Sequence, residues 1–134
     1  MERTKTIAAN VAVIILVALL LIWGDTWWRQ WRQFSKGEQA QAAGDVIGAI
    51  AGYESAIHMY TPASPLVERA AGKLWSLGEE LERRGDRERA LIAYRSLRSS
   101  FYAARWLAQP GTKWIERCDA KIAALVKQPQ KQGN

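Results

Sequence analysis

One stretch near the N-terminus limits what this chain can fold into more than any other. Residues 7–23 read IAANVAVIILVALLLIW, with no charged side chain and a single polar one, Asn10. A helix rises about 1.5 Å per residue, so the stretch spans roughly 25 Å and just reaches the length needed to cross a hydrocarbon core. We therefore predict a transmembrane helix over residues 7–24, preceded by a short N-terminal tail over residues 1–6.

A cluster of aromatic and basic residues follows the apolar stretch directly. Tryptophan side chains prefer the headgroup level of a bilayer, because the ring is mostly apolar while its N–H stays hydrated. We interpret residues 25–36 as a juxtamembrane helix at one membrane surface. The residues assigned to this membrane interface are Trp23, Trp27, Trp28, Arg29, Trp31 and Arg32.

The alternative to a membrane anchor is a cleaved signal peptide, with Arg3 and Lys5 as its basic start. Such peptides end in small residues with an A-x-A-like pattern, whereas this apolar stretch runs into Trp-Gly-Asp-Thr-Trp-Trp. An uncleaved, single-pass membrane anchor is therefore favoured. Basic residues near the two ends of the helix nearly balance, so they give only a slight preference for a cytoplasmic C-terminal domain.

The rest of the chain contains an internal repeat, which appears when Gly37 is aligned with Gly78, 41 positions later. The shared pattern is G-x6-G-D-x3-A-[IL]-x2-Y. Its second glycine can end a helix in the left-handed conformation, and the aspartate that follows can accept the free N–H groups of the next helix. The residues that define the repeat are Gly37, Gly44, Ala49, Tyr53, Gly78, Gly85, Ala90 and Tyr94.

This pattern resembles the tetratricopeptide repeat (TPR), a stack of antiparallel helical hairpins. Leu74 and Leu77 in the second unit also fall on positions typical of that family, whereas Gln33 and Lys36 replace its large apolar residues in the first unit. The period of 41 is also longer than the usual repeat of about 34 residues. The resemblance implies about two repeats over residues 37–108, with a concave face of the kind that binds peptides or helices.

These signals together predict an all-α chain, in which a transmembrane helix is followed by TPR-like hairpins and a capping helix. Helices are expected over residues 27–43, 46–60 and 65–84, and again from Asp86. The capping helix is assigned to residues 109–127, with Thr112 as its N-cap, because a stack needs a last helix to cover its apolar face. Residues 128–134 are polar and are expected to be disordered. The pattern leaves open whether Trp75, Trp106 and Trp114 belong to the core or to an interface.

The sequence offers no residue constellation typical of an enzyme. The one histidine, His58, lies late in a helix, and a metal site needs three or four converging ligands. The one cysteine, Cys118, falls on an apolar helix stripe, where a free thiol is usually inert. The net charge of +6 lacks the clustered basic stripe of a nucleic-acid-binding domain. We therefore predict a non-catalytic protein with no cofactor, no metal and no nucleic-acid partner.

The leading functional hypothesis is an accessory or scaffold subunit of a bacterial-type inner-membrane complex, in which the repeats hold a protein partner. Arginine and aromatic residues are enriched at the centres of protein interfaces. The candidate partner-binding residues of this type are Arg95, Arg98, Tyr102, Arg105 and Trp106. The alternative is a lipid-surface or self-assembling module that uses the Trp/Arg-rich junction. Homo-oligomerisation is also possible, because two repeats form a small core, and repeat arrays usually need three or more units to be stable.

Overall fold

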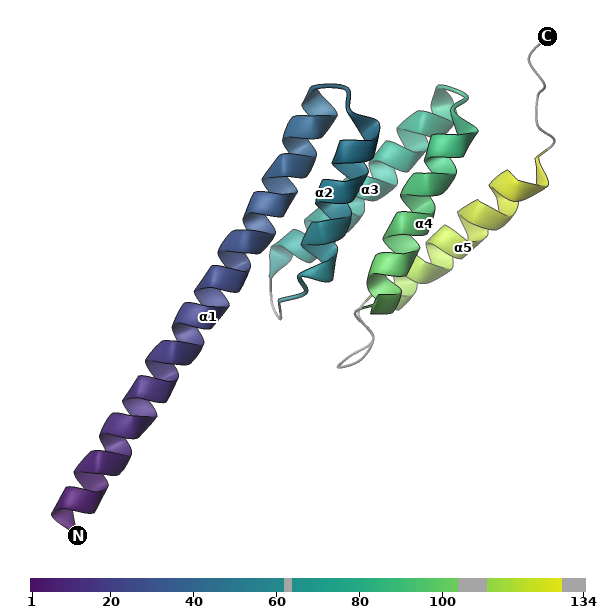
Figure 1. The fold of residues 1–134 in the computed structure, drawn as a ribbon. Coiled ribbons are helices and arrows are strands. Elements are labelled where there is room, and N and C mark those ends of the chain that lie inside the picture. The colour runs from purple at the N-terminus through teal and green to yellow at the C-terminus, as the bar shows by residue number, and fades with distance from the viewer. Residues whose placement is uncertain (62–63, 104–110, 129–134) are drawn as a thin grey trace.

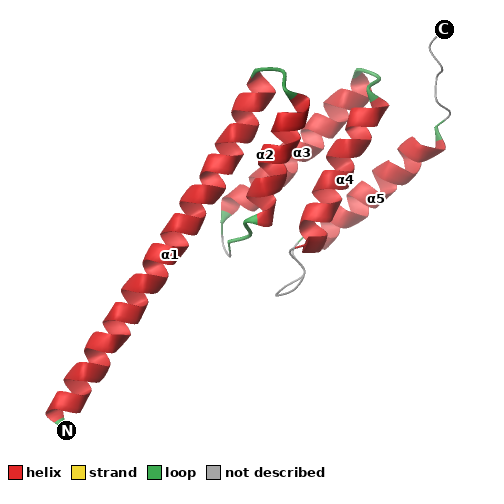
Figure 2. Cartoon of the chain, in the orientation of Figure 1, coloured by secondary structure: helices red, strands yellow, loops and turns green. Residues whose placement is uncertain are grey.

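The fold consists of five helices in the part of the chain that the structure describes. The structure is a computed structural model and describes residues 1–61, 64–103 and 111–128. The helices are α1 (Glu2–Ala42), α2 (Val46–His58), α3 (Pro65–Arg83), α4 (Arg87–Ala103) and α5 (Thr112–Lys127). Figures 1 and 2 show the long helix α1 beside the shorter helices α2 to α5. The predicted all-α fold class is therefore confirmed.

Helix α1 is a single unbroken helix that contains both the apolar stretch and the first helix of the first hairpin. Its 41 residues correspond to a length of about 60 Å. Figure 1 shows its N-terminal half extending away from the bundle, while its C-terminal half packs against α2. The apolar part is long and apolar enough to cross a membrane, and it is not buried against the rest of the chain.

The two helical hairpins, α1–α2 and α3–α4, turn in the same way. Gly44 and Gly85 each have a φ of 78°, a left-handed conformation that glycine adopts without steric cost. The carboxylates of Asp45 and Asp86 then accept the backbone N–H three residues further on, at 2.9 Å and 3.1 Å. The turn chemistry read from the repeat therefore has the same geometry in both hairpins.

A tyrosine ring on the second helix of each hairpin lies against a glycine on the first. A Cβ atom placed on Gly37 would lie 2.9 Å from Cδ1 of Tyr53, and one on Gly78 would lie 2.7 Å from Cε1 of Tyr94. Real Cβ atoms essentially never approach another atom so closely. Glycine is therefore what allows the two helices of each hairpin to meet with an aromatic ring between them.

The tyrosine hydroxyls also form matching hydrogen bonds. Tyr53 donates to Oε1 of Gln41 at 2.6 Å, and Tyr94 donates to Oε1 of Glu82 at 2.5 Å. Gln41 and Glu82 are 41 positions apart, as the two tyrosines are. Burial raises the pKa of Tyr53 to about 12, with a smaller contribution from Glu38, so its hydroxyl remains a donor at neutral pH.

The helices of the bundle form two layers. Helix α2 packs against α1, α3 and α4, and α1 also contacts α3, whereas α5 packs against α4. In Figure 1, α3 and α5 lie behind α2 and α4. Ile115, Cys118 and Leu125 are the buried residues of α5, and they cover the last hairpin.

Two details of the helix ends differ from the sequence-based expectation. Helix α2 ends at His58 rather than at residue 60, and Pro62 in the sequence disfavours helical backbone in the residue before it. Thr112 is the first residue of α5 and does not cap it, so that prediction was wrong. The N-cap is Gly111, which has a φ of 80° and makes no side-chain cap. A β-carbon there would collide with the ring of Phe101, so glycine fits where a capping side chain could not.

Candidate functional site

The first candidate surface is the apolar half of α1. Large apolar side chains from Ile7 to Trp23 are 48–69% exposed, whereas side chains of this kind are usually buried in water-soluble folds. The tryptophans predicted at the membrane interface lie at the end of this surface and stack in pairs. The Trp23 and Trp27 ring centroids are 6.4 Å apart, and those of Trp28 and Trp31 are 5.3 Å apart.

The two arginines assigned to this interface stand on the same helix. Arg29 forms an ion pair with Asp25 at 2.9 Å, and both side chains are more than half exposed. Exposed pairs of this kind contribute little to stability, about 0–1 kcal/mol. Arg32 is exposed as well. Both cations therefore remain accessible to solvent, or to anionic groups beside the helix.

A buried glutamine among the tryptophans, between Trp28 and Trp31, connects α1 to the bundle. Gln30 is fully buried; its Nε2 donates to the carbonyl of Ala56 at 2.9 Å, and its Oε1 accepts from Oγ of Ser64 at 2.6 Å. Oγ of Ser64 in turn accepts from the backbone N–H of Leu66 and so caps α3. One side chain on α1 thus links the end of α2 to the start of α3. Sequence reasoning missed it, because no local pattern marks Gln30 as buried.

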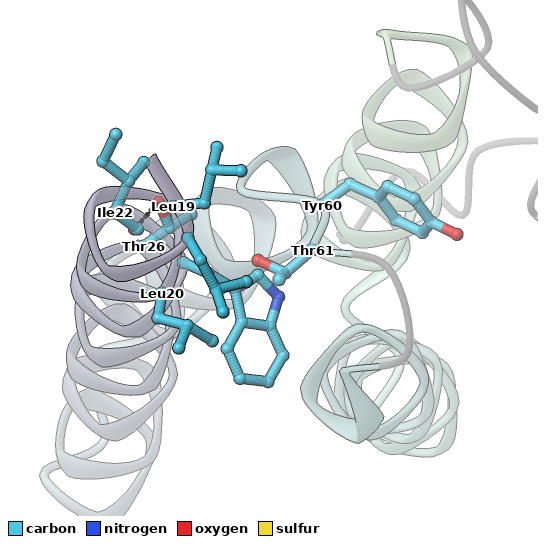
Figure 3. Close-up of a pocket in the computed structure, with 8 residues that line it drawn as sticks. Leu19, Leu20, Ile22, Thr26, Tyr60 and Thr61 are labelled. Atoms are coloured by element: carbon cyan, nitrogen blue, oxygen red, sulfur yellow. Dashed lines mark hydrogen bonds between the residues drawn. The ribbon is translucent and has the colours of Figure 1, made fainter. Parts of the chain in front are cut away.

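A groove lies directly below this connection, between α1 and the segment that follows α2. Its volume is about 660 Å³. It is lined by Leu16, Leu19, Leu20, Ile22, Trp23, Thr26, Tyr60 and Thr61. Figure 3 shows Thr61 reaching toward α1, while the ring of Tyr60 extends away from it. The groove therefore joins the apolar surface of α1 to the lower end of the bundle.

The candidate partner-binding residues on α4 lie in different settings. Arg95 is exposed. Arg98 is half-buried and forms an ion pair with Asp119 of α5 at 2.7 Å, and its guanidinium lies 5.4 Å from the centroid of the exposed Tyr102 ring. Arg98 thus contributes to the α4–α5 contact, whereas Arg95 and Tyr102 remain on the surface. Arg105 and Trp106 fall outside the described residues.

A second aromatic and cationic cluster joins α3 to α5. The Arg117 guanidinium lies 4.2 Å from the Trp75 ring centroid and 4.8 Å from that of Trp114. Trp114 also donates to Oε2 of Glu68 at 3.1 Å. Trp75 is buried and Trp114 is partly buried, which places the first in the core and the second at its edge. The sequence could not reveal this cluster, because its members come from two helices, α3 and α5, that are not consecutive in the chain.

The titratable groups expected to be inert occupy ordinary structural positions. His58 is exposed and lies 3.9 Å from Glu54, one turn earlier on the same helix. Among the described residues, no three His, Cys, Asp or Glu side chains are placed to hold a metal ion. Cys118 is fully buried, and burial raises the pKa of its thiol to about 12. Because the thiolate is the reactive form of cysteine, burial and a raised pKa both disfavour reaction of Cys118 at neutral pH.

Comparisons of the chain with protein-family models, with curated proteins and with solved structures found no match. The function is therefore inferred from the residues and their geometry.

Proposed function

We propose that the protein is a single-pass membrane protein whose helical hairpins form a TPR-like adaptor that holds a protein partner beside the bilayer. The observation that carries this proposal is the continuity of α1. Its exposed apolar half and the first helix of the hairpin stack form one helix without an intervening linker. The apolar half of α1, which favours a membrane, is thus joined to the repeated helical hairpins without a flexible connection.

The membrane part of the proposal is supported by the chemistry of α1. Its apolar half exposes large side chains on every face, which water would not favour, and it ends in a group of tryptophans typical of a headgroup layer. The basic and aromatic character of this junction gives a slight preference for a cytoplasmic bundle.

The adaptor part is supported by the repetition in the two hairpins. The glycine turn, the contact between glycine and tyrosine, and the hydrogen bond of the tyrosine hydroxyl all recur 41 positions later in the chain. Repeated hairpins of this kind stack into extended binding surfaces. Arg95 and Tyr102 are residue types common at the centres of protein interfaces, and both are exposed on α4. We extend the proposal to a scaffold or accessory subunit of a bacterial-type inner-membrane complex, in which the hairpins hold the partner.

The test is a crosslinked affinity purification of the full-length, C-terminally tagged protein from native membranes. We expect one or two stoichiometric membrane proteins, and we expect Arg95→Glu to reduce their recovery at least fivefold. Lys127→Glu makes the same change of charge at the exposed end of α5, and it should leave the recovery unchanged. Recovery of no partner by the unmodified protein would refute the adaptor proposal.

The side of the membrane is tested separately. Ile47 is exposed near the start of α2. Figure 1 shows that this end of α2 lies away from the apolar half of α1. In intact cells, a membrane-impermeant maleimide should leave Ile47→Cys unlabelled if the bundle is cytoplasmic. Labelling without cell disruption would place the bundle on the opposite side.

A further inference from the structure

The lower end of the bundle lies level with the point where α1 would leave a membrane. Gln30 is seven residues beyond Trp23, which is about 10 Å along the helix axis. Its partner Ala56 lies only two residues before the end of α2, so α2 ends about 3 Å closer to the apolar half. The headgroup region on each side of a bilayer is roughly 5–7 Å thick. With α1 inserted up to Trp23, residues 59–61 therefore reach headgroup depth.

The bundle is held in this position rather than free to move away. Helix α1 has no break between its apolar half and the hairpin. The Cα atoms of Gly37 and Gly52 pack so closely that a Cβ atom on Gly52 would lie 2.5 Å from the backbone of Gly37. Gln30 and its two buried hydrogen bonds fix the connection at the lower end. The height of the bundle above the bilayer is thus set by the fold.

The groove at this end has the polarity of a phospholipid. Its wall on α1 is apolar apart from Thr26, whose hydroxyl donates to the carbonyl of Ile22 at 2.9 Å. Thr61 faces this wall from the segment after α2, and its hydroxyl donates to the carbonyl of Met59 at 3.2 Å. The described lining carries no charged side chain. An amphiphile whose apolar chains follow α1 and whose polar end stops below the bundle matches this distribution.

A second copy of α1 fits the groove less well. Helix α2 packs on α1 from the turn at Gly44 down to Gln30, and the segment with Thr61 lies below it. A second transmembrane helix on this face would have to continue upward into space that the bundle already fills. A lipid ends at the headgroup layer and meets no such obstacle.

We propose that the α2–α3 end of the bundle is a membrane-contacting surface, with a phospholipid of the surrounding bilayer filling the groove between Thr61 and α1. This inference rests on the proposed membrane insertion of α1. It adds a lipid-facing surface to a bundle that could otherwise be read as a water-exposed domain. It also places Arg29 and Arg32 beside the same headgroup layer, where cations are attracted to an anionic lipid surface.

The experiment uses three single-cysteine variants of the full-length protein in a Cys118→Ala background, each labelled with an environment-sensitive fluorophore. His58→Cys and Ile47→Cys lie at opposite ends of α2, and both positions are exposed, so they form a matched pair. Ile14→Cys reports whether α1 is inserted. The labelled proteins are reconstituted in phosphatidylcholine–phosphatidylglycerol vesicles that contain lipids with a nitroxide at carbon 5 or carbon 12.

We expect the fluorescence emission of the label at residue 58 to be blue-shifted and to be quenched at least twofold by the nitroxide at carbon 5. The emission of the label at residue 47 should show neither change. The label at residue 14 should be quenched most strongly by the deep nitroxide. If residue 14 is quenched and residue 58 is not, the surface proposal is overturned while the membrane anchor stands. If residue 14 is not quenched by either lipid, the membrane anchor itself is refuted.

Two further readouts identify the occupant of the groove. Phospholipids with a photoactivatable group in the acyl chain should form adducts at Tyr60 or Thr61 as well as on α1. Adducts confined to α1 would overturn the groove assignment. The blue shift at residue 58 should also survive a tenfold dilution with unlabelled lipid. Its loss on dilution, together with crosslinked dimers, would show that a second copy fills the groove and would overturn the lipid proposal.

Discussion

The contact between Gly78 and Tyr94 provides the sharpest test of the hairpin packing, because α3 contains a matched control. A Cβ atom on Gly78 would lie 2.7 Å from the Tyr94 ring, whereas one on Gly72 of the same helix would meet nothing within 4 Å. Both substitutions to alanine remove a helical glycine and should gain about 0.5–1 kcal/mol in backbone entropy. Only Gly78→Ala adds an overpacking cost, typically about 1–3 kcal/mol.

The ring of Tyr94 has little room to move away from the added methyl group. Its hydroxyl is held by Glu82 at 2.5 Å, and its ring centroid lies 5.1 Å from that of Trp75. We therefore expect Gly72→Ala to stabilise the bundle and Gly78→Ala to leave it about 1–3 kcal/mol less stable than Gly72→Ala. With a urea m-value of roughly 1.5 kcal/mol/M, this difference separates the two midpoints by about 0.7–2 M.

The assay is urea unfolding of the full-length protein in a mild detergent, followed by a short alkylation pulse. Cys118 is the one cysteine of the chain and is fully buried, so its modification reports the opening of the bundle and not of the membrane helix. Gly37→Ala repeats the test in the first hairpin, where the added Cβ would lie 2.9 Å from the Tyr53 ring. Equal stabilisation by Gly72→Ala and Gly78→Ala would refute the close packing of Tyr94 on α3.

Three further predictions use the same urea titration. Asp86→Ala should lower the free energy of unfolding by about 0.5–2 kcal/mol, because the Asp86 carboxylate caps α4. Asp86→Asn should retain most of this stability, and an equal loss in both variants would contradict a capping role. Gln30→Leu should lower the free energy of unfolding by about 1–3 kcal/mol, because it leaves the buried carbonyl of Ala56 without its hydrogen-bond donor. An unchanged urea midpoint would show that water hydrates this carbonyl instead. Burial raises the pKa of Cys118 from 9 to about 12 and that of Tyr53 from 10 to about 12. Both groups ionise more readily when unfolded, so their contribution to stability is complete below pH 9 and is lost as the pH rises toward 12. This pH series is followed by tryptophan fluorescence instead of alkylation, because Cys118→Ala, which should reduce the loss, has no cysteine to label. A midpoint independent of pH over this range would refute the assignment.

The sequence predicted the positions of the hairpins well, because the signals involved are local. A glycine and an aspartate in adjacent positions define a turn by their own backbone and side-chain chemistry, and the structure places φ values of 78° at both glycines. The pattern also placed Cys118 on an apolar stripe, and the thiol is buried. The N-cap of α5 was misassigned, because Gly111 is favoured by a distant ring, that of Phe101, and not by a neighbour in the sequence.

The candidate surfaces depended on contacts that no local pattern encodes. Arg98 reads as an exposed arginine in the sequence, yet Asp119 on the next helix holds it at 2.7 Å. No sequence pattern indicates a role for Arg117, yet its guanidinium lies against the rings of Trp75 and Trp114. These partners are brought together by the way the helices cross, which depends on the packing of the whole bundle.

The sequence by itself determined that the chain is helical, that one segment is apolar throughout, and that two hairpins repeat the same turn. These properties follow from hydrophobicity and from backbone preferences within a few residues. Only the structure decided that the apolar segment and the first helix of the first hairpin form one unbroken helix, and that Gln30 fixes the bundle beside it. It also created the groove at Thr61. Its lining comes from segments more than thirty residues apart, and their meeting is set by close helix packing rather than by any local preference.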